Sequence, residues 1–141
     1  MNYHEIEEKV RRLFNKQLGY AAAKKRLPIG DATRKHEFDI YEPRRVIGGI
    51  STSPWKNRSG TNNTGGQDRA AAELLWLNLW DGNERRVHVL TNLEMANETF
   101  ERFQNGAFSH AIDIFHCDHR KGMFTSIGRL EPKRSRRTPR Q

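Results

Sequence analysis

An aspartate and a glycine-containing apolar segment mark the place where chemistry is most expected. Asp39 stands near the end of the segment His36–Tyr41, and a second apolar segment covers Val46–Thr52. Both segments predict β-strands. Because side chains alternate between the two faces of a strand, Gly49 and Ser51 share one face of the second segment. A glycine inside a strand indicates that another group approaches the backbone closely. We therefore expect the face with Asp39, Gly49 and Ser51 to be the functional one.

These two segments resemble the PD-(D/E)xK nuclease superfamily, which includes restriction endonucleases and archaeal Holliday-junction resolvases. The similarity covers about residues 3–117: a leading helix with acidic residues, a strand with Asp39, a strand similar to V-I-G-E-V-K-T, then a helix and a strand. The resemblance implies a restriction-endonuclease-like fold with an αβββαβ core. It also implies a Mg²⁺-dependent endodeoxyribonuclease, in which Asp39 is the first metal ligand.

The chain departs from the family pattern at two positions that carry the chemistry. By the resemblance, the second acidic ligand falls on Gly49, and the lysine beside the attacking water falls on Ser51. A glycine provides no ligand for the cation, and a serine provides no positive charge. One interpretation is therefore a degenerate relative, which binds nucleic acid or another protein without cutting.

In the other interpretation the missing groups have moved to neighbouring elements. The resemblance allows the acid to stand on the following helix, where Glu73 lies, and it allows a further acid at Glu7 or Glu8 of the first helix. Arg69 precedes Glu73 by one helical turn on the same face. The predicted catalytic residues are Asp39, Glu73, Lys56 and Arg69, and the predicted metal ligands are Asp39, Glu73 and Glu7.

Ordinary roles for the same side chains stay open. Arg69 and Glu73 also fit an ion pair on a helix surface, which contributes little to stability. Glu7 also fits a solvated carboxylate at the positive end of a helix dipole. Trp55 fits either a base-stacking residue or an anchor of its loop.

A large excess of positive charge favours nucleic acid as the partner. The net charge is +8, and the sequence pI is about 10.1. Such a charge attracts polyanions and promotes counterion release. We expect DNA rather than RNA. The candidate nucleic-acid contacts are Lys24, Lys25, Arg26, Lys56, Arg58, Arg134, Arg136 and Arg137.

The length of 141 residues predicts one domain. We assign it to residues 1–130 and expect residues 131–141 to form a basic, disordered tail. Cys117 is the only cysteine, which excludes an intrachain disulfide and fits a reducing, cytoplasmic compartment. No apolar run is long enough to predict a membrane span. A homodimer is implied by the resemblance alone.

The apolar periodicity predicts an α/β fold with a mixed central sheet flanked by helices. Asp68 is the expected cap of the second helix, which we expect to be largely buried. Loops are expected over 27–31 and 53–66. The predicted helices cover 3–18, 69–80 and 94–103, and the predicted strands cover 36–41, 46–52, 86–91 and 110–117. Residues 123–130 are apolar enough for a last packed segment.

Overall fold

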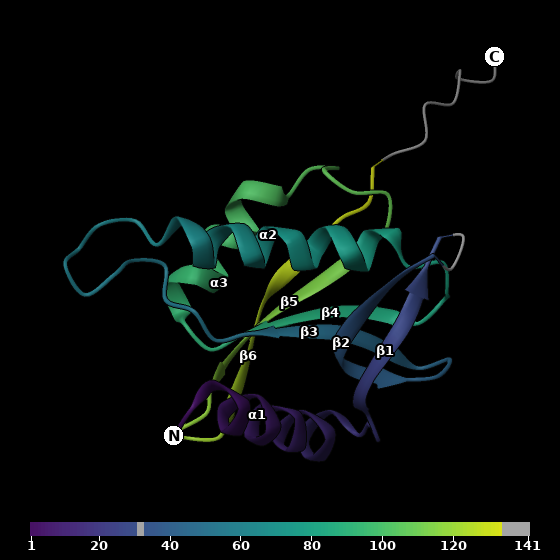
Figure 1. Cartoon of the computed structure of the whole chain (residues 1–141), viewed down its shortest axis with the longest axis horizontal. Helices are drawn as coiled ribbons and strands as arrows, with labels where there is room; N and C mark the ends of the chain where they lie inside the picture. Colours follow the sequence, from purple (N-terminus) through teal and green to yellow (C-terminus); the bar gives the residue numbers. More distant parts are fainter. Residues whose placement is uncertain (31–32, 134–141) are drawn as a thin grey trace.

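The computed structural model of the chain describes residues 1–30 and 33–133. These residues form three helices and six strands (Figure 1). In chain order they are α1 (Tyr3–Leu18), β1 (Ala23–Ile29), β2 (Arg34–Glu42), β3 (Val46–Ser51), α2 (Thr64–Leu79), β4 (Arg85–Leu90), α3 (Leu93–Phe103), β5 (Ile112–Asp118) and β6 (Met123–Leu130).

The strands form one mixed sheet in the order β1-β2-β3-β4-β5-β6. Strands β1, β2 and β3 are antiparallel, β3, β4 and β5 are parallel, and β6 is antiparallel to β5. Helix α1 covers one face of this sheet, and α2 and α3 cover the other (Figure 1). The predicted α/β class with a mixed sheet flanked by helices is thereby confirmed. None of the described helices is both long and apolar enough for a membrane crossing.

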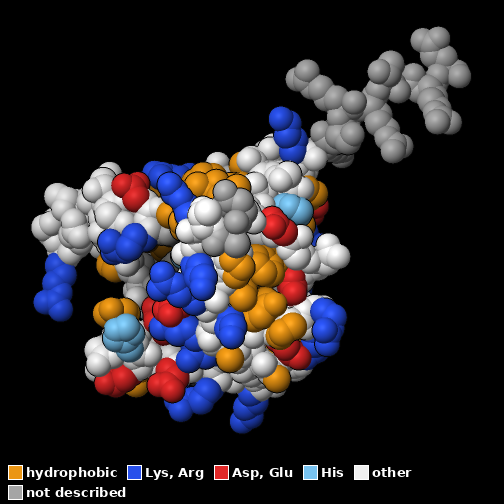
Figure 2. Space-filling view, turned by 45° about the vertical axis from the view of Figure 1, so that its right-hand side comes forward, with side chains coloured by type: hydrophobic (Ala, Val, Ile, Leu, Met, Phe, Trp, Pro, Cys, Tyr) orange, Lys and Arg blue, Asp and Glu red, His pale blue; other side chains and the backbone are white. Residues whose placement is uncertain are grey.

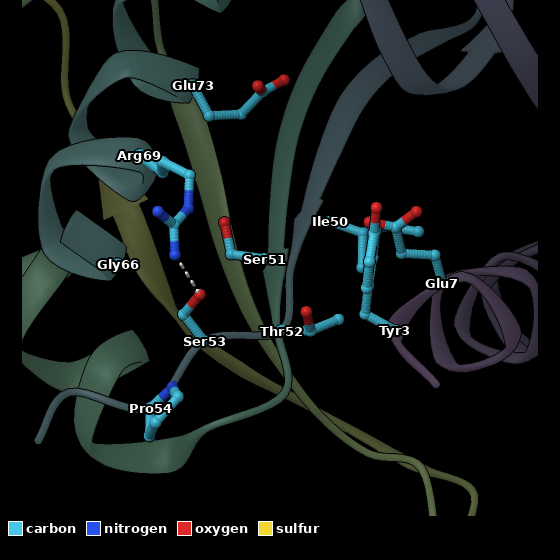
Figure 3. Close-up of a pocket in the computed structure, with 10 residues that line it drawn as sticks. All are labelled: Tyr3, Glu7, Ile50, Ser51, Thr52, Ser53, Pro54, Gly66, Arg69 and Glu73. Carbon is cyan, nitrogen blue, oxygen red and sulfur yellow. Dashed lines mark hydrogen bonds between the residues drawn. The ribbon is translucent and has the colours of Figure 1, made fainter. Parts of the chain in front are cut away.

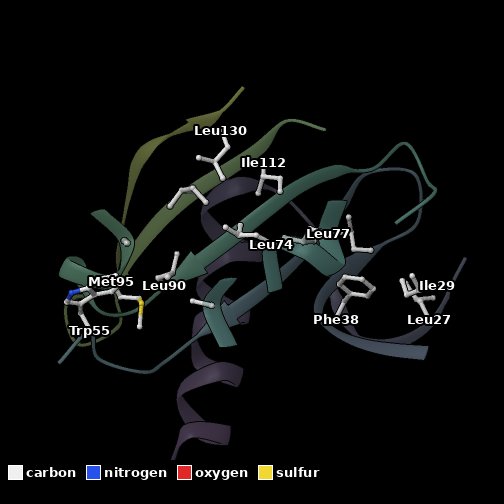
Figure 4. Close-up of a cluster of buried hydrophobic side chains, with 14 residues drawn as sticks. Leu27, Ile29, Phe38, Trp55, Leu74, Leu77, Leu90, Met95, Ile112 and Leu130 are labelled. Carbon is white, nitrogen blue, oxygen red and sulfur yellow. The ribbon is translucent and has the colours of Figure 1, made fainter. Parts of the chain in front are cut away.

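Each face of the sheet has its own hydrophobic core. Val10 and Phe14 of α1 are fully buried against one face. On the other face, α2 contributes Leu74 and Leu77 to a larger cluster that also contains Phe38 of β2 (Figure 4). A polar site must therefore lie where an element ends or where a polar side chain interrupts these cores.

Two of the predictions for the second helix are wrong. Helix α2 begins at Thr64, because Asn63 rather than Asp68 caps it and accepts a hydrogen bond from the backbone N–H of Gly66. The helix is also less buried than expected, since Leu75 and Leu79 are 50% and 45% exposed. The sequence places apolar residues on several sides of this helix, yet only one side of it can contact the sheet.

The last three residues of strand β1, 27–29, were predicted as part of a loop over residues 27–31, of which residue 31 lies outside the described residues. The structure instead places Leu27 and Ile29 in the core, with Pro28 exposed between them. This alternation is that of a strand with one buried face. A proline is tolerated there because β1 lies at the edge of the sheet, where half of the backbone N–H groups need no partner.

A bulge in β2 determines where Asp39 lies. Ala23 of β1 pairs with Tyr41 and Lys25 pairs with Phe38, so β2 has one extra residue between these pairs. Phe38 and Ile40 consequently belong to opposite cores, although strict alternation would put them on one face. Asp39 is thus held at an irregular position inside the strand, and not near its end as predicted.

A buried arginine fixes the other end of α2. The guanidinium of Arg86 on β4 donates hydrogen bonds to the backbone carbonyls of Leu77, Trp80, Gly82 and Glu84. Arg86 is only 6% exposed. The last carbonyls of a helix have no partner within the helix. Arg86 satisfies one of them, that of Leu77, together with three carbonyls of the segment that follows, and so joins the end of α2 to the sheet.

We expect Arg86→Ala to lower the free energy of unfolding by about 3 kcal/mol or more, because several buried carbonyls lose their donor. Urea denaturation measures this change. The neighbouring Arg85→Ala variant is the control, since Arg85 is partly exposed and its partner Asp113 keeps a second arginine, Arg129. A loss of about 1 kcal/mol or less is expected for it. Equal losses would contradict the role assigned to Arg86.

Candidate functional site

A cavity of about 590 Å³ opens where α1, the end of β3 and the first half of α2 come together (Figure 3). Its walls contain acids, hydroxyls and one arginine. The lining residues are Tyr3 and Glu7 from α1, Ile50 to Pro54 from β3 and the following segment, and Gly66, Arg69 and Glu73 from α2. The cavity therefore contains three of the predicted site residues, which come from two separate helices.

Glu73 occupies the space that a side chain on Gly49 would fill. A Cβ atom built on Gly49 would lie 2.3 Å from both Cγ and Oε1 of Glu73. These distances are far below van der Waals contact, so no residue with a side chain fits at position 49 unless Glu73 moves. The helix thus delivers a carboxylate to the point on β3 where the resemblance places the second acid.

One carboxylate oxygen of Glu73 is fixed and the other has no partner. His36 of β2 lies with its Nε2 atom 3.0 Å from Oε2 of Glu73. The imidazole is itself held by stacking on Trp76, at 4.8 Å between the ring centroids. Oε1 is buried and has no hydrogen-bond partner within the described part of the chain. An unsatisfied buried oxygen of this kind is available to a ligand.

The ordinary reading of Glu73, as one half of a surface ion pair with Arg69, is wrong. Arg69 donates instead to Oγ of Ser53, at 3.2 Å between the heavy atoms (Figure 3). Among the described residues the charged partner of Glu73 is His36. Arg69 therefore remains on the cavity wall as a cation that no carboxylate neutralises there.

Asp39 lies beside this cavity and is held by the next strand. Its Oδ2 atom accepts a hydrogen bond of 2.8 Å from the backbone N–H of Ile50. Burial raises the pKa of Asp39 to about 7, and the nearby carboxylates of Glu7 and Glu73 act in the same direction. Near neutral pH this carboxyl is therefore poised between its two protonation states.

Glu7 lines the cavity from the α1 side, where burial also raises its pKa. Its Oε1 atom is 3.9 Å from Nζ of Lys24, so it is partly neutralised. No group of three or more His, Cys, Asp or Glu side chains within the described ranges is arranged to hold a metal ion. A cation site in this region would therefore have two carboxylates from the protein, those of Asp39 and Glu73.

Ser51, on which the resemblance places a lysine, faces a histidine. Its Oγ atom is 2.7 Å from Nε2 of His88. His88 is fully buried, and burial lowers its pKa to about 3, so the ring is neutral. This strand position therefore contributes no positive charge. Lys56, the predicted substitute, is not among the residues that line the cavity.

The predicted nucleic-acid contacts lie in two separate places. Lys24, Lys25 and Arg26 are on the edge strand β1, where Lys24 also contacts Glu37 at 3.4 Å. Lys56 and Arg58 are on the segment between β3 and α2. Arg134, Arg136 and Arg137 lie outside the described residues, as does most of the predicted tail; Lys133 is described, and its backbone N–H donates to the carbonyl of Phe108.

Two histidines of the site were not predicted. His36 stands three residues before Asp39 on the same strand, and this proximity was a signal that the sequence did contain. His88 gave no such signal, because its contact with Ser51 arises from the parallel pairing of β3 and β4. Trp55, for which two roles stayed open, is an anchor: it is only 9% exposed and belongs to the larger core.

Comparisons with protein-family models, with curated proteins and with solved structures find no match. The residues around the cavity are accordingly the features of this chain that bear on its function.

We expect Asp39→Asn to stabilise the protein in the presence of a chelator at about pH 8 by roughly 1–4 kcal/mol. A carboxyl whose pKa is raised by folding to about 7 destabilises the folded state when it ionises. That penalty grows as the pH rises from the unfolded-state pKa to the folded-state value, and it vanishes below both. The asparagine keeps an acceptor for Ile50 and has no charge to bury.

Urea denaturation of both proteins across this pH range measures the effect. The difference in unfolding free energy should shrink toward zero near about pH 4. A difference that does not depend on pH would show that Asp39 does not have a raised pKa.

Proposed function

We propose that this protein binds nucleic acid and hydrolyses its phosphodiester bonds, with Mg²⁺ held by Asp39 and Glu73. The observation that carries the proposal is the position of Glu73, whose carboxylate fills the space above Gly49. On this view the chain has the restriction-endonuclease-like fold, with one acid moved from strand to helix. The element order α1-β1-β2-β3-α2-β4 agrees with the αβββαβ core that the resemblance implies.

The donor atoms suit a hard cation. Oε1 of Glu73 has no hydrogen-bond partner in the described residues, and Asp39 has one oxygen that is not used by Ile50. Mg²⁺ commonly takes one or two carboxylates from a protein and completes its shell with water and substrate phosphate. When bound, the cation would lower the pKa of a water molecule and offset phosphate charge. Glu7 would act from the opposite wall, as a more distant acid.

The protein's own side chains have separate tasks in this proposal. His36 fixes one oxygen of Glu73, so that the other keeps a constant direction. Arg69 offers a guanidinium on the cavity wall, where it suits a phosphate oxygen. It would supply the positive charge that Ser51 lacks, but it cannot act as a base, because an arginine is not deprotonated in proteins.

A second candidate function, binding without cleavage, is favoured by one specific contact. Ser51 is engaged with the neutral ring of His88 at the position where the family uses a lysine. A site that lacks this cation could retain the binding surface and lose the reaction. The two candidates predict the same affinity for nucleic acid and different outcomes in a cleavage assay.

We expect cleavage of a labelled DNA in the presence of Mg²⁺ or Mn²⁺, and none in excess chelator. Asp39→Asn and Glu73→Gln should each reduce the rate by about 100-fold or more, as is usual when a group that acts in the transition state is lost. Glu8→Gln is a matched control on the exposed side of α1 and should change little. Binding of the intact DNA, measured in chelator, should persist in all variants. If no metal supports cleavage of any DNA, binding alone is the function.

An exchange of side chains tests the proposed relocation of the acid directly. Glu73→Ala removes the carboxylate and leaves room above position 49. Adding Gly49→Glu to that variant returns an acid to β3, and we expect the double variant to recover part of the cleavage that Glu73→Ala loses. Gly49→Glu alone should be inactive or poorly folded, because two side chains then compete for one space. A double variant that folds, binds Mn²⁺ and shows no recovery would contradict the relocation.

A further inference from the structure

The segment between β3 and α2, which was predicted as a loop, forms a short hairpin. Lys56 and Asn62 form an antiparallel bridge, and the backbone N–H of Asn57 donates to the carbonyl of Thr61 at 2.8 Å. The N–H of Gly60 closes the turn on the carbonyl of Asn57, and Gly60 has the positive φ of 87° that such a turn requires. We call residues 55–63 the hairpin.

The base of the hairpin is firmly attached to the body of the protein. Trp55 is buried, and its carbonyl accepts hydrogen bonds from the backbone of Asn63 and from Nε2 of Gln67. The guanidinium of Arg102 lies over the Trp55 ring, 4.6 Å from its centroid. A segment that is already ordered loses little entropy when it binds a partner.

The hairpin extends away from the body, past the first turn of α2 (Figure 1). Residues at its foot, Ser53 and Pro54, line the cavity. In the space-filling view this projection carries basic side chains, and the surface is hollowed below it (Figure 2). A partner that lies along the hairpin as far as Ser53 and Pro54 therefore reaches the opening of the cavity.

The chemistry of the hairpin suits a polyanion. From Ser51 to Gln67 the chain has Lys56 and Arg58 and no acidic residue. Both cations are exposed, and neither forms an ion pair within the described residues. Trp55 is the large apolar side chain of the hairpin and is turned into the core, so the exposed surface is unsuited to an apolar protein groove or a lipid membrane.

The shape of the hairpin selects among polyanions. The major groove of B-form DNA is about 12 Å wide and accepts a two-stranded β-ribbon, whereas its minor groove is about 6 Å wide. The major groove of duplex RNA is too deep and narrow for side chains to read. A single-stranded nucleic acid has no groove that the hairpin could enter. Arg58, at the turn, would be the residue that reaches furthest.

We propose that the hairpin enters the major groove of duplex DNA and sets a double-stranded segment across the cavity. This inference rests on the nucleic-acid binding proposed above and names its substrate class. It requires neither a metal ion nor cleavage.

The test is fluorescence anisotropy in excess chelator, with DNA duplex, RNA duplex and single-stranded DNA of one sequence. We expect the DNA duplex to bind best, and Lys56→Ala/Arg58→Ala to weaken that binding roughly 10- to 100-fold. The control is Arg12→Ala/Lys16→Ala, which removes the same charge from the exposed side of α1, on the opposite face of the sheet from α2 (Figure 1). Equal weakening by both pairs would overturn the inference, because charge alone would then explain binding. Thermal unfolding should be unchanged in both variants.

A duplex whose major groove is filled by glucosylated hydroxymethylcytosine provides a second measurement. We expect the protein to bind this duplex no better than it binds single-stranded DNA. A minor-groove ligand such as netropsin should compete only weakly with the protein for the unmodified duplex. Unchanged binding to the glucosylated duplex, or equal affinity for duplex RNA, would overturn the inference. A protein that passes these tests and never cleaves would overturn the nuclease proposal alone. Cleavage that survives in Lys56→Ala/Arg58→Ala with full duplex affinity would overturn the hairpin's role alone.

Discussion

The close contact between Glu73 and the bare backbone of Gly49 is the constraint on which the site depends. Because position 49 has no side chain, a carboxylate from α2 can lie directly on β3. The same contact brings that carboxylate near Asp39 and within reach of His36. A larger residue at position 49 would displace the carboxylate of Glu73 from this place. The missing side chain at Gly49 and the acid that α2 places against it are thus two aspects of one arrangement.

Several features of the fold then hold the two acids in place at some cost. The bulge in β2 turns Asp39 out of the regular alternation, and the backbone of Ile50 binds one of its oxygens. Arg86 secures the distal end of α2. Burial without a full set of partners is unfavourable for carboxylates, and here it raises the pKa of Asp39. Groups kept in such a state, beside a cavity, are more typical of functional sites than of structural ones.

Most of the fold was predictable from apolar periodicity, and the exceptions have identifiable causes. The amphipathic pattern of α1 was enough to predict that helix with the observed bounds, whereas residues 123–130 were predicted only as a last packed segment and form strand β6. Strand β1 was missed because Pro28 suggests a loop, and the edge position that tolerates a proline is a property of the whole sheet. The start of α2 at Thr64, capped by Asn63, was missed because several residues in that segment are good caps. For the site, the pairing of Glu73 with His36 rather than Arg69 depends on how α2 lies on the sheet, which the spacing of residues along one helix does not determine.

Charge links the cavity to the hairpin. The carboxylates of Glu7 and Glu73, which line the cavity, repel the phosphates of DNA, so the cavity by itself would disfavour the ligand proposed for it. Arg69 on the wall and the acid-free hairpin beside it supply the opposite sign, and a cation at Asp39 and Glu73 would offset the rest. The positive charge of the chain is therefore best understood by its distribution. Lys24 is partly used in ion pairs with Glu7 and Glu37, while Lys56 and Arg58 have no such partners in the described chain. Arg69 on the cavity wall and the two cations of the neighbouring hairpin are therefore available to an anionic ligand.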